Sequence, residues 1–147
     1  MIRNDQVIIC LNVSHLSDIE TLLQNCDLPF EDCKEQLDNF YGITSGNDLI
    51  AIGALQIKGP VALLRSVAVL EGNRGKGLAF RMTQHLLEVA RTNGVRDIYL
   101  LTESAEHYFT RFGFQAVERN SVPAYVQSTR QFESLCPASA QAMCLVL

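Results

Sequence analysis

The 147-residue chain is 48% hydrophobic and 19% charged, which is typical of a globular protein and excludes a disordered one. Its length fits one domain spanning residues 1–147. The formal net charge of −4 provides no overall positive field, so neither nucleic acid nor a membrane surface is expected as a partner.

The first half of the chain predicts two helices followed by a β-meander. A strand is expected at 6–13, and a helix capped by Ser14 or Ser17 should run to about Asn25. A second short helix is expected at 31–39, because acidic residues occupy its first turn. The meander strands are expected at 40–44, 49–57 and 61–70.

The second half alternates helices and strands. The long helix at about 77–93 is amphipathic and ends at Asn93-Gly94, and the strand at 97–103 is apolar on both faces, as in a central strand. The remaining expected elements are a short helix that ends at Gly113, a strand at 114–119, a helix at 123–133 and a strand at 140–147. This order predicts a mixed α/β (α+β) domain.

The chain is organised around residues 66–93, which read as a strand, a glycine-rich turn and a helix. Gly72, Gly75 and Gly77 fall within six residues, so the backbone can turn its amides toward an anion. The following helix adds unpaired N–H groups and the positive end of its dipole. Arg74 and Lys76 add charge, and the turn is therefore predicted to hold a pyrophosphate.

Two nucleotide-binding motifs do not fit this turn. A P-loop requires Lys-Ser/Thr, whereas Leu78-Ala79 follows Gly77. The dinucleotide motif requires a third small residue where Phe80 stands, and it belongs at the start of a βαβ unit.

Two stretches resemble the GNAT acetyltransferases. Residues 74–79 match the family's Q/R-x-x-G-x-G/A motif, and Val67-Ala68-Val69 matches the strand before it. Residues 105–114, with the pattern Ala-x-x-Tyr-Phe-x-x-x-Gly-Phe, match a second GNAT motif. The resemblance implies a central, mostly antiparallel sheet with a splayed parallel strand pair, flanked by helices.

The resemblance also implies that acetyl-CoA is the acyl donor, with no metal. The glycine turn would hold the pyrophosphate and the 67–69 strand the pantetheine, while the amide of Val69 or a neighbour polarises the thioester carbonyl. An amine would then attack that carbonyl directly. The cofactor-binding residues implied are Val67, Ala68, Val69, Arg74, Gly75, Lys76, Gly77, Leu78 and Ala79.

The sequence departs from the family at two positions. Thr102 stands where the family often has Asn, and Phe109 replaces a Tyr that commonly protonates the departing thiolate. Tyr108 is adjacent, but one residue rotates a helix by about 100°, so Tyr108 is either core packing or the acid. A CoA thiolate is a good leaving group, so the chemistry can proceed without an acid.

The general base is not identified by the sequence. Glu71, Glu103 and His107 are candidates near the predicted cleft, but the sequence favours a solvated surface group for each. His85 is expected to be a satisfied structural histidine. Cys136 lacks an obvious base partner for a nucleophilic role.

The acceptor is read from the C-terminal residues 122–140. They resemble the GNAT subgroup associated with arsenic-resistance gene clusters and, more loosely, N-acetylglutamate synthases. Both comparisons imply the primary amine of a small, acidic, amino-acid-like molecule. Arg65 shares side-chain parity with Val67 and Val69 and is either its carboxylate clamp or an exposed strand-start residue. Arg111 and Arg130 are weaker candidates.

Two other functions remain open. One is a protein or peptide N-acetyltransferase, and the other is a CoA-binding module without turnover. The protein is expected as a monomer or homodimer.

The remaining sequence features favour a soluble, cytoplasmic protein. There is no signal-peptide pattern and no run near the ~18–20 apolar residues of a membrane span. The cysteines form no C-x-x-C pair, and they are expected to be reduced and mostly buried: Cys10, Cys26, Cys33, Cys136 and Cys144.

Overall fold

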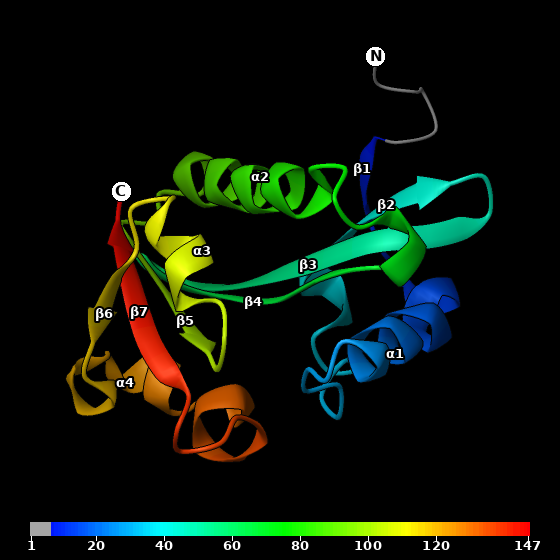
Figure 1. The fold of residues 1–147 in the computed structure, drawn as a ribbon. Helices are drawn as coiled ribbons and strands as arrows, with labels where there is room; N and C mark the ends of the chain where they lie inside the picture. The colour runs from blue at the N-terminus through cyan, green and yellow to red at the C-terminus, as the bar shows by residue number, and fades with distance from the viewer. Residues whose placement is uncertain (1–6) are drawn as a thin grey trace. The chain divides into compact units, whose positions relative to one another are not determined.

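The computed structural model describes residues 7–147, and within them seven strands form one sheet in the order β1-β2-β3-β4-β5-β7-β6 (Figure 1). The strands are β1 (Ile8–Cys10), β2 (Phe40–Ser45), β3 (Asp48–Lys58), β4 (Val61–Val69), β5 (Asp97–Thr102), β6 (Gln115–Val117) and β7 (Gln141–Val146). The helices are α1 (Leu16–Asn25), α2 (Leu78–Thr92), α3 (Glu106–Thr110) and α4 (Ala124–Gln127). The sheet is mostly antiparallel with β4 and β5 as its parallel pair, which confirms the predicted fold class.

The chain divides into two compact units. The first, unit 1, comprises Met1–Leu55 and Ser66–Glu88, and the second, unit 2, comprises Gln56–Arg65 and Val89–Leu147. Three elements, β3, β4 and α2, therefore contribute residues to both units.

In unit 1, helix α1 covers one face of the β1-β2-β3 sheet. Its buried side chains Ile19 and Leu23 belong to one core cluster with Ile52 and Ala54 of β3. The cap of this segment differs from the prediction. The side chain of Asn12, rather than a serine, accepts the backbone N–H of Ser14 at 2.9 Å and starts a 3₁₀ turn that leads into α1.

The opposite face of β3 in unit 1 faces α2. Gly53 alternates with Ile52 and Ala54, so it faces the other way. A Cβ on Gly53 would lie 2.7 Å from Cγ of Met82 and 2.9 Å from a methyl carbon of Leu86. The missing side chain therefore allows α2 to pack directly on the strand.

The prediction of a helix at 31–39 is wrong. That segment is a series of turns followed by a 3₁₀ turn, Leu37–Asn39. Its backbone bonds include the three-residue spacing typical of tight turns, such as Cys33 N–H to the Phe30 carbonyl at 3.1 Å. Asp32 and Cys33 are almost completely buried, so tertiary contacts outweigh the weak preference of a nine-residue helix.

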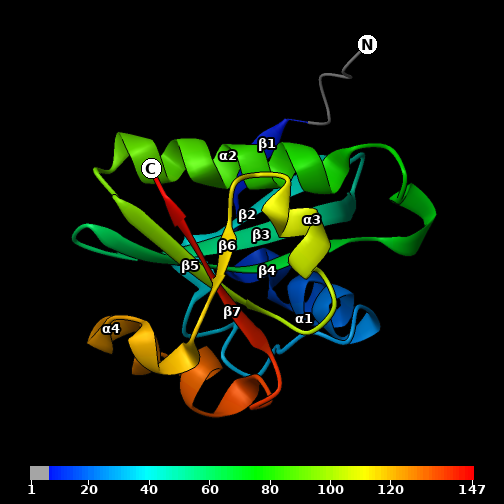
Figure 2. The ribbon, with the colours of Figure 1, turned by 60° about the vertical axis from the view of Figure 1, so that its left-hand side comes forward.

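Unit 2 is built on β5 and β7, with β7 lying between β5 and β6 (Figure 2). The parallel register of β4 with β5 covers three residue pairs, from Val61–Asp97 to Leu63–Tyr99. A second core cluster joins Leu63 of β4 and Ala142 of β7 to Val126 of α4 and Phe132.

The helix predicted at 123–133 is interrupted. It consists of α4 and a π-helical turn, Gln131–Leu135. Between them, the Thr129 hydroxyl donates to the Val126 carbonyl at 2.7 Å and accepts the Phe132 N–H at 3.4 Å. A side chain that competes for backbone hydrogen bonds in this way breaks the regular helical pattern.

The prediction that most thiols are buried is wrong. All five cysteines are free, but only Cys33 is buried, Cys10 is exposed and the other three are half-buried. No helix between residues 7 and 147 is long and apolar enough to cross a membrane.

Candidate functional site

The glycine turn of unit 1 has the backbone that the sequence predicts. Gly75 and Gly77 both have a φ of 79°, in the left-handed region where a side chain is strained. A Cβ at either position would meet no atom within 4 Å. The glycines are therefore required by conformation rather than by crowding, and the space beside their backbone is open.

Helix α2 starts directly after this turn. The backbone N–H of Arg81, in the first turn of α2, donates to the Gly77 carbonyl at 3.0 Å. Gly77 is therefore the N-terminal cap of the helix. The first turn of α2 contains no acidic residue, which leaves the positive end of its dipole uncompensated by side chains. Leu78 is buried and anchors this turn, whereas Lys76 is exposed.

The Arg74 side chain folds back onto the end of β4. Its Nε donates to the Val69 carbonyl at 3.2 Å, and its Nη2 lies 3.4 Å from the Cys26 sulfur. The Cys26 thiol also lies 3.8 Å from the Val69 carbonyl. Arg74 and Lys76 are both exposed, but Arg74 must leave these contacts to reach a phosphate.

At the end of β4, the backbone hydrogen-bonds to β3 on one edge only. The Leu70 N–H donates to the Ile50 carbonyl of β3 at 2.8 Å, and the carbonyl of Val69 in the same trans peptide therefore points to the opposite edge. Val69 and Val67 are half-buried, while Ala68 is buried in the core that contains α1. The Ala68 side chain therefore faces the core, and the Val69 carbonyl at the other edge of the strand accepts from Arg74.

Ser66 interrupts the regular geometry of β4. Its φ of 63° lies in the left-handed region, which is uncommon for a residue with a side chain. The parity argument that placed Arg65 on the face of Val67 and Val69 assumed an extended backbone, and it does not apply across Ser66.

Arg65 lies in the interior of unit 2, which rules out the exposed-residue interpretation. It is 2% exposed, and its Nη1 donates to Oε1 of Gln56 at 3.0 Å. Gln56, itself buried, also hydrogen-bonds the hydroxyl of Tyr125. The neutral amide of Gln56 is therefore one of the contacts that orient the guanidinium.

Cys136 lies among polar groups of the same unit. Burial raises the pKa of its thiol, against the opposing effects of a hydrogen bond from Gln131 and the positive charges of Arg65 and Arg119, while Glu103 raises it further. A thiol held protonated in this way is a poor nucleophile. Arg65 and Glu103, two predicted site residues, therefore lie around one thiol.

Arg119 fixes the backbone that follows Gln131. Its Nη1 donates to the carbonyls of Pro137 at 3.1 Å and Ala140 at 3.2 Å, and its Nη2 donates to that of Phe132 at 3.1 Å. Its guanidinium also lies 5.2 Å from the centre of the Phe132 ring. These contacts hold the π-helical turn in one place.

Helix α3 carries the predicted acid. The Tyr108 ring packs edge-on against Phe109 and Phe112, with ring centres 5.1 and 5.4 Å apart, and its buried hydroxyl has no hydrogen-bond partner among the described residues. Both interpretations of Tyr108 therefore stay open. Thr102, at the family's Asn position, accepts the Ala105 N–H at 2.9 Å and caps the turn into α3.

Most of the other candidates lie at the surface. Glu71, Glu103, His107, Arg111 and Arg130 are exposed. His85 packs against the Tyr41 ring with centres 4.9 Å apart, but its buried Nε2 has no partner in the described part of the chain, so it is not the satisfied histidine predicted. Burial lowers the pKa of His85.

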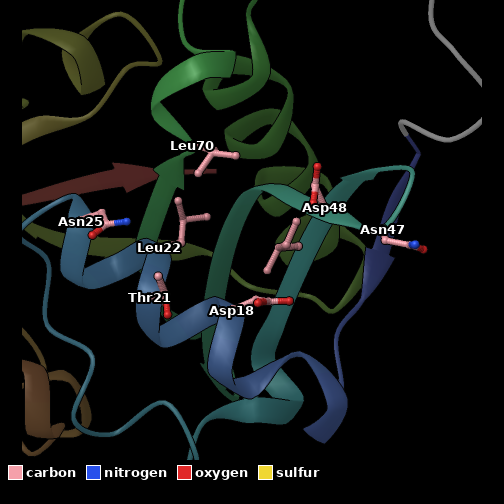
Figure 3. A pocket seen from close by; sticks show the side chains of 8 residues that line it. Asp18, Thr21, Leu22, Asn25, Asn47, Asp48 and Leu70 are labelled. Carbon is pink, nitrogen blue, oxygen red and sulfur yellow. The ribbon is translucent and has the colours of Figure 1, made fainter.

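Unit 1 also contains a polar pocket of about 250 Å³ that the sequence analysis did not single out (Figure 3). It lies between α1 and the turn joining β2 to β3. Its lining residues are Asp18, Thr21, Leu22, Asn25, Asn47, Asp48, Leu49 and Leu70. Both carboxylates are exposed, and no lining side chain presents a buried polar atom without a partner.

The model of the acetyltransferase (GNAT) family matches residues 12–114. The chain belongs to the GNAT acetyltransferase family. The glycine turn and the Tyr108 helix both lie within the matched segment. No curated protein matches the chain.

Solved structures share the fold of this GNAT protein at low identity. Rv2747 of Mycobacterium tuberculosis, solved with CoA and a second ligand, is 22% identical with a TM-score of 0.79, and the match covers 96% of this chain and 99% of that one. N-acetylglutamate synthase of Neisseria gonorrhoeae, solved with coenzyme A and N-acetyl-glutamate, is 15% identical with a TM-score of 0.81, covering 99% and 36%. The ribosomal-protein-S18-alanine N-acetyltransferase of Escherichia coli is 17% identical with a TM-score of 0.72, covering 96% and 93%.

Several polar residues of unit 2 were missed by sequence reasoning. Gln56, Gln131 and Arg119 stand in segments whose pattern predicts only strand, helix and turn. The sequence did contain one indication, at Gln56. This residue interrupts an otherwise apolar strand beside Leu55 and Ile57, and a polar residue in a buried strand needs a hydrogen-bond partner.

Proposed function

We propose that this GNAT protein is an N-acetyltransferase that moves an acetyl group from acetyl-CoA to the primary amine of a small, acidic, amino-acid-like molecule. The observation that carries the proposal is the buried guanidinium of Arg65, oriented by the neutral amide of Gln56. A guanidinium held in one orientation is suited to bind a carboxylate through paired, charge-assisted hydrogen bonds.

The residues of unit 1 fit acetyl-CoA. The open backbone at Gly75 and Gly77 and the start of α2 suit a pyrophosphate, and Lys76 supplies an exposed cation. The peptide groups of Val67 and Val69 suit an extended pantetheine amide chain. When bound, acetyl-CoA supplies a thioester whose carbonyl carbon is attacked by the amine, with the CoA thiolate as the leaving group.

The chain must handle one proton, because an ammonium cannot attack until it is deprotonated. Glu103 is the preferred base, since its carboxylate acts on the same thiol as Arg65 does. Glu103 is exposed, as Glu71 and His107 are, so its shared neighbour with Arg65, the Cys136 thiol, is the reason for preferring it. The Tyr108 hydroxyl is a candidate acid, and Tyr108→Phe tests it: a kcat reduced more than tenfold would assign the role, whereas an unchanged kcat would leave Tyr108 as packing.

The choice of an acidic acceptor has two further supports. The tail resembles the arsenic-resistance subgroup, and one structural neighbour was solved with N-acetyl-glutamate. An ordinary amino acid and an arsenical analogue share the carboxylate and the amine that the proposal requires. We further propose a cytoplasmic protein, as monomer or homodimer.

Thermal shift followed by thiol release tests the proposal. CoA at ten to a hundred times its Kd should stabilise the protein by about 1.4–2.7 kcal/mol. CoA-thiol release from acetyl-CoA is then measured with amino acids, peptides and simple amines. Release with small acidic amino acids is expected.

Each alternative gives a different result. Release only with peptides would indicate a protein or peptide N-acetyltransferase. Binding of CoA without release on any amine would indicate a CoA-binding module, and the absence of any CoA-induced shift would contradict the whole assignment.

A further inference from the structure

Two side chains occupy the backbone carbonyl of Val69. Nε of Arg74 donates to this oxygen at 3.2 Å, and the Cys26 thiol donates to it at 3.8 Å. Nη2 of Arg74 in turn donates to the Cys26 sulfur at 3.4 Å. The carbonyl, the guanidinium and the thiol therefore form a closed ring of contacts, and all three belong to unit 1.

The Val69 carbonyl lies beyond the part of β4 that pairs with β5. The parallel register of the two strands ends at Leu63 and Tyr99, before Val69 is reached. An unpaired strand edge can bind an extended chain through its amide groups. The oxygen that Arg74 occupies is thus the acceptor that an amide N–H of an extended ligand would use.

Cys26 holds its end of the ring in a fixed position. Its backbone N–H closes α1 by donating to the carbonyls of Leu22 at 3.2 Å and Leu23 at 3.1 Å, and its side chain packs against the core of unit 1. The last turn of α1 contains no basic residue. The guanidinium of Arg74 therefore also supplies a positive charge at the negative end of this helix dipole.

Arg74 can change partners without moving the glycine turn. Its backbone N–H donates to the Glu71 carbonyl at 3.3 Å, which fixes the main chain at the end of a 3₁₀ turn, Glu71–Asn73. Its side chain is exposed, and neither of its two partners is a carboxylate. A phosphate group forms stronger, charge-assisted bonds with a guanidinium than a carbonyl or a thiol does. Rotation of the side chain alone would make this exchange.

We propose that Arg74 is a latch on the end of β4, held closed by the Cys26 thiol and opened by acetyl-CoA. In the free protein the guanidinium occupies the Val69 carbonyl. When the cofactor binds, an amide N–H of its pantetheine takes this oxygen, and the released guanidinium pairs with the pyrophosphate. The inference rests on the proposed function and adds a step that couples the two parts of the cofactor. Cys26 acts through Arg74 and is a positioning residue.

The latch gives Arg74 opposite effects on the two parts of the cofactor. For pantetheine, which carries no phosphate, the closed latch is only a competitor for the Val69 carbonyl. For CoA, pairing with the pyrophosphate compensates the guanidinium for the contacts that it leaves. An arginine that only bound phosphate would favour CoA without affecting pantetheine, so the two ligands distinguish the two roles.

The first test is Arg74→Met in the full chain, since methionine keeps an aliphatic side chain and donates no hydrogen bond. The Kd of pantetheine, measured by calorimetric competition with CoA, should fall about threefold or more, while that of CoA should rise by a similar factor. The matched control is Lys76→Met, at an exposed cation of the same turn. It should raise the Kd of CoA and leave that of pantetheine unchanged. An unchanged or raised Kd of pantetheine in Arg74→Met would overturn the latch.

The second test needs CoA alone. Cys26→Ala removes one contact of the latch and keeps the guanidinium, so the Kd of CoA should fall about twofold to threefold. The same substitution in Arg74→Met should have no effect, because the thiol acts through Arg74. Cys10→Ala, at the exposed thiol of unit 1, is the control and should leave both values unchanged. Equal effects of Cys26→Ala in both backgrounds would contradict its role as a positioning residue.

Failure of the latch is distinguishable from failure of the proposed function. If neither CoA nor pantetheine binds, the proposed function is wrong and the latch with it. If CoA binds and an amine releases its thiol, but pantetheine binds equally to the unsubstituted protein and Arg74→Met, the proposed function stands and the latch is wrong. If pantetheine binds more tightly to Arg74→Met but no amine releases thiol, the latch stands and the catalytic proposal is wrong.

Discussion

The glycine turn of unit 1 and the polar cluster of unit 2 are built in different ways. The turn depends on backbone conformation, and its decisive residues, Gly75 and Gly77, stand together in the sequence. The cluster depends on side chains from separate segments, including Gln56, Arg65 and Gln131. We infer that donor recognition is local and readable from sequence, whereas acceptor recognition is assembled by the fold.

This contrast predicts separable effects on the two ligands. Arg65→Met should reduce kcat/KM for the acidic acceptor about thirtyfold or more, because losing a buried charge partner costs about 2–5 kcal/mol. The Kd of CoA, measured calorimetrically, should stay the same. Arg96→Met, at an exposed arginine of unit 2, is the control. An unchanged acceptor KM in a folded Arg65→Met protein would assign Arg65 to structure alone.

Arg119 tests how the backbone around the polar cluster of unit 2 is held in place. Arg119→Met removes three hydrogen bonds to backbone carbonyls and the contact with the Phe132 ring. At about 1 kcal/mol for each bond, the free energy of unfolding in urea should fall by about 3 kcal/mol. Arg111→Met, at an exposed arginine, should stay within about 0.5 kcal/mol. A loss below 1 kcal/mol in Arg119→Met would mean that the tail is held by other contacts.

A substitution in the glycine turn tests the backbone side of the contrast. In Gly77→Ala, the left-handed φ should cost about 1–2 kcal/mol, and the Kd of CoA should rise about tenfold. No atom lies within 4 Å of the added carbon, so a clash cannot explain the loss. Gly72→Ala is the matched control, because its Cβ is equally unobstructed and its φ is not left-handed. Equal effects of both changes would contradict the conformational explanation.

The same contrast explains what the sequence predicted. The sheet strands, α2 and the glycine turn were found because hydrophobic period and glycine spacing are local patterns. The helix at 31–39 was wrong because burial of Asp32 and Cys33 is a tertiary effect. The helix at 123–133 was interrupted because the Thr129 side chain competes for its backbone bonds.

Most of the polar cluster of unit 2 could not be predicted from the sequence. Arg65 was identified as a candidate, but its partner Gln56 lies on a different strand and Gln131 on a turn of the tail. No fixed spacing in the sequence links these three residues. Their positions depend on the pairing of neighbouring strands β3 and β4 and on the path of the tail, which periodicity alone does not determine.

The smallest expected effect concerns His85, which lies in unit 1 with the glycine turn. Burial lowers its pKa below the ordinary value of 6.5, so below that pH the unfolded state takes up a proton that the folded state resists. Stability should therefore fall as pH drops from 6.5 toward the lowered pKa. His85→Gln removes this titration, and its free energy of unfolding relative to the unsubstituted protein should be more favourable at pH 5.5 than at pH 7.5. Parallel pH profiles of the two proteins would show that the imidazole is protonated as easily in the folded state as in the unfolded chain, and that its packing against Tyr41 does not exclude water.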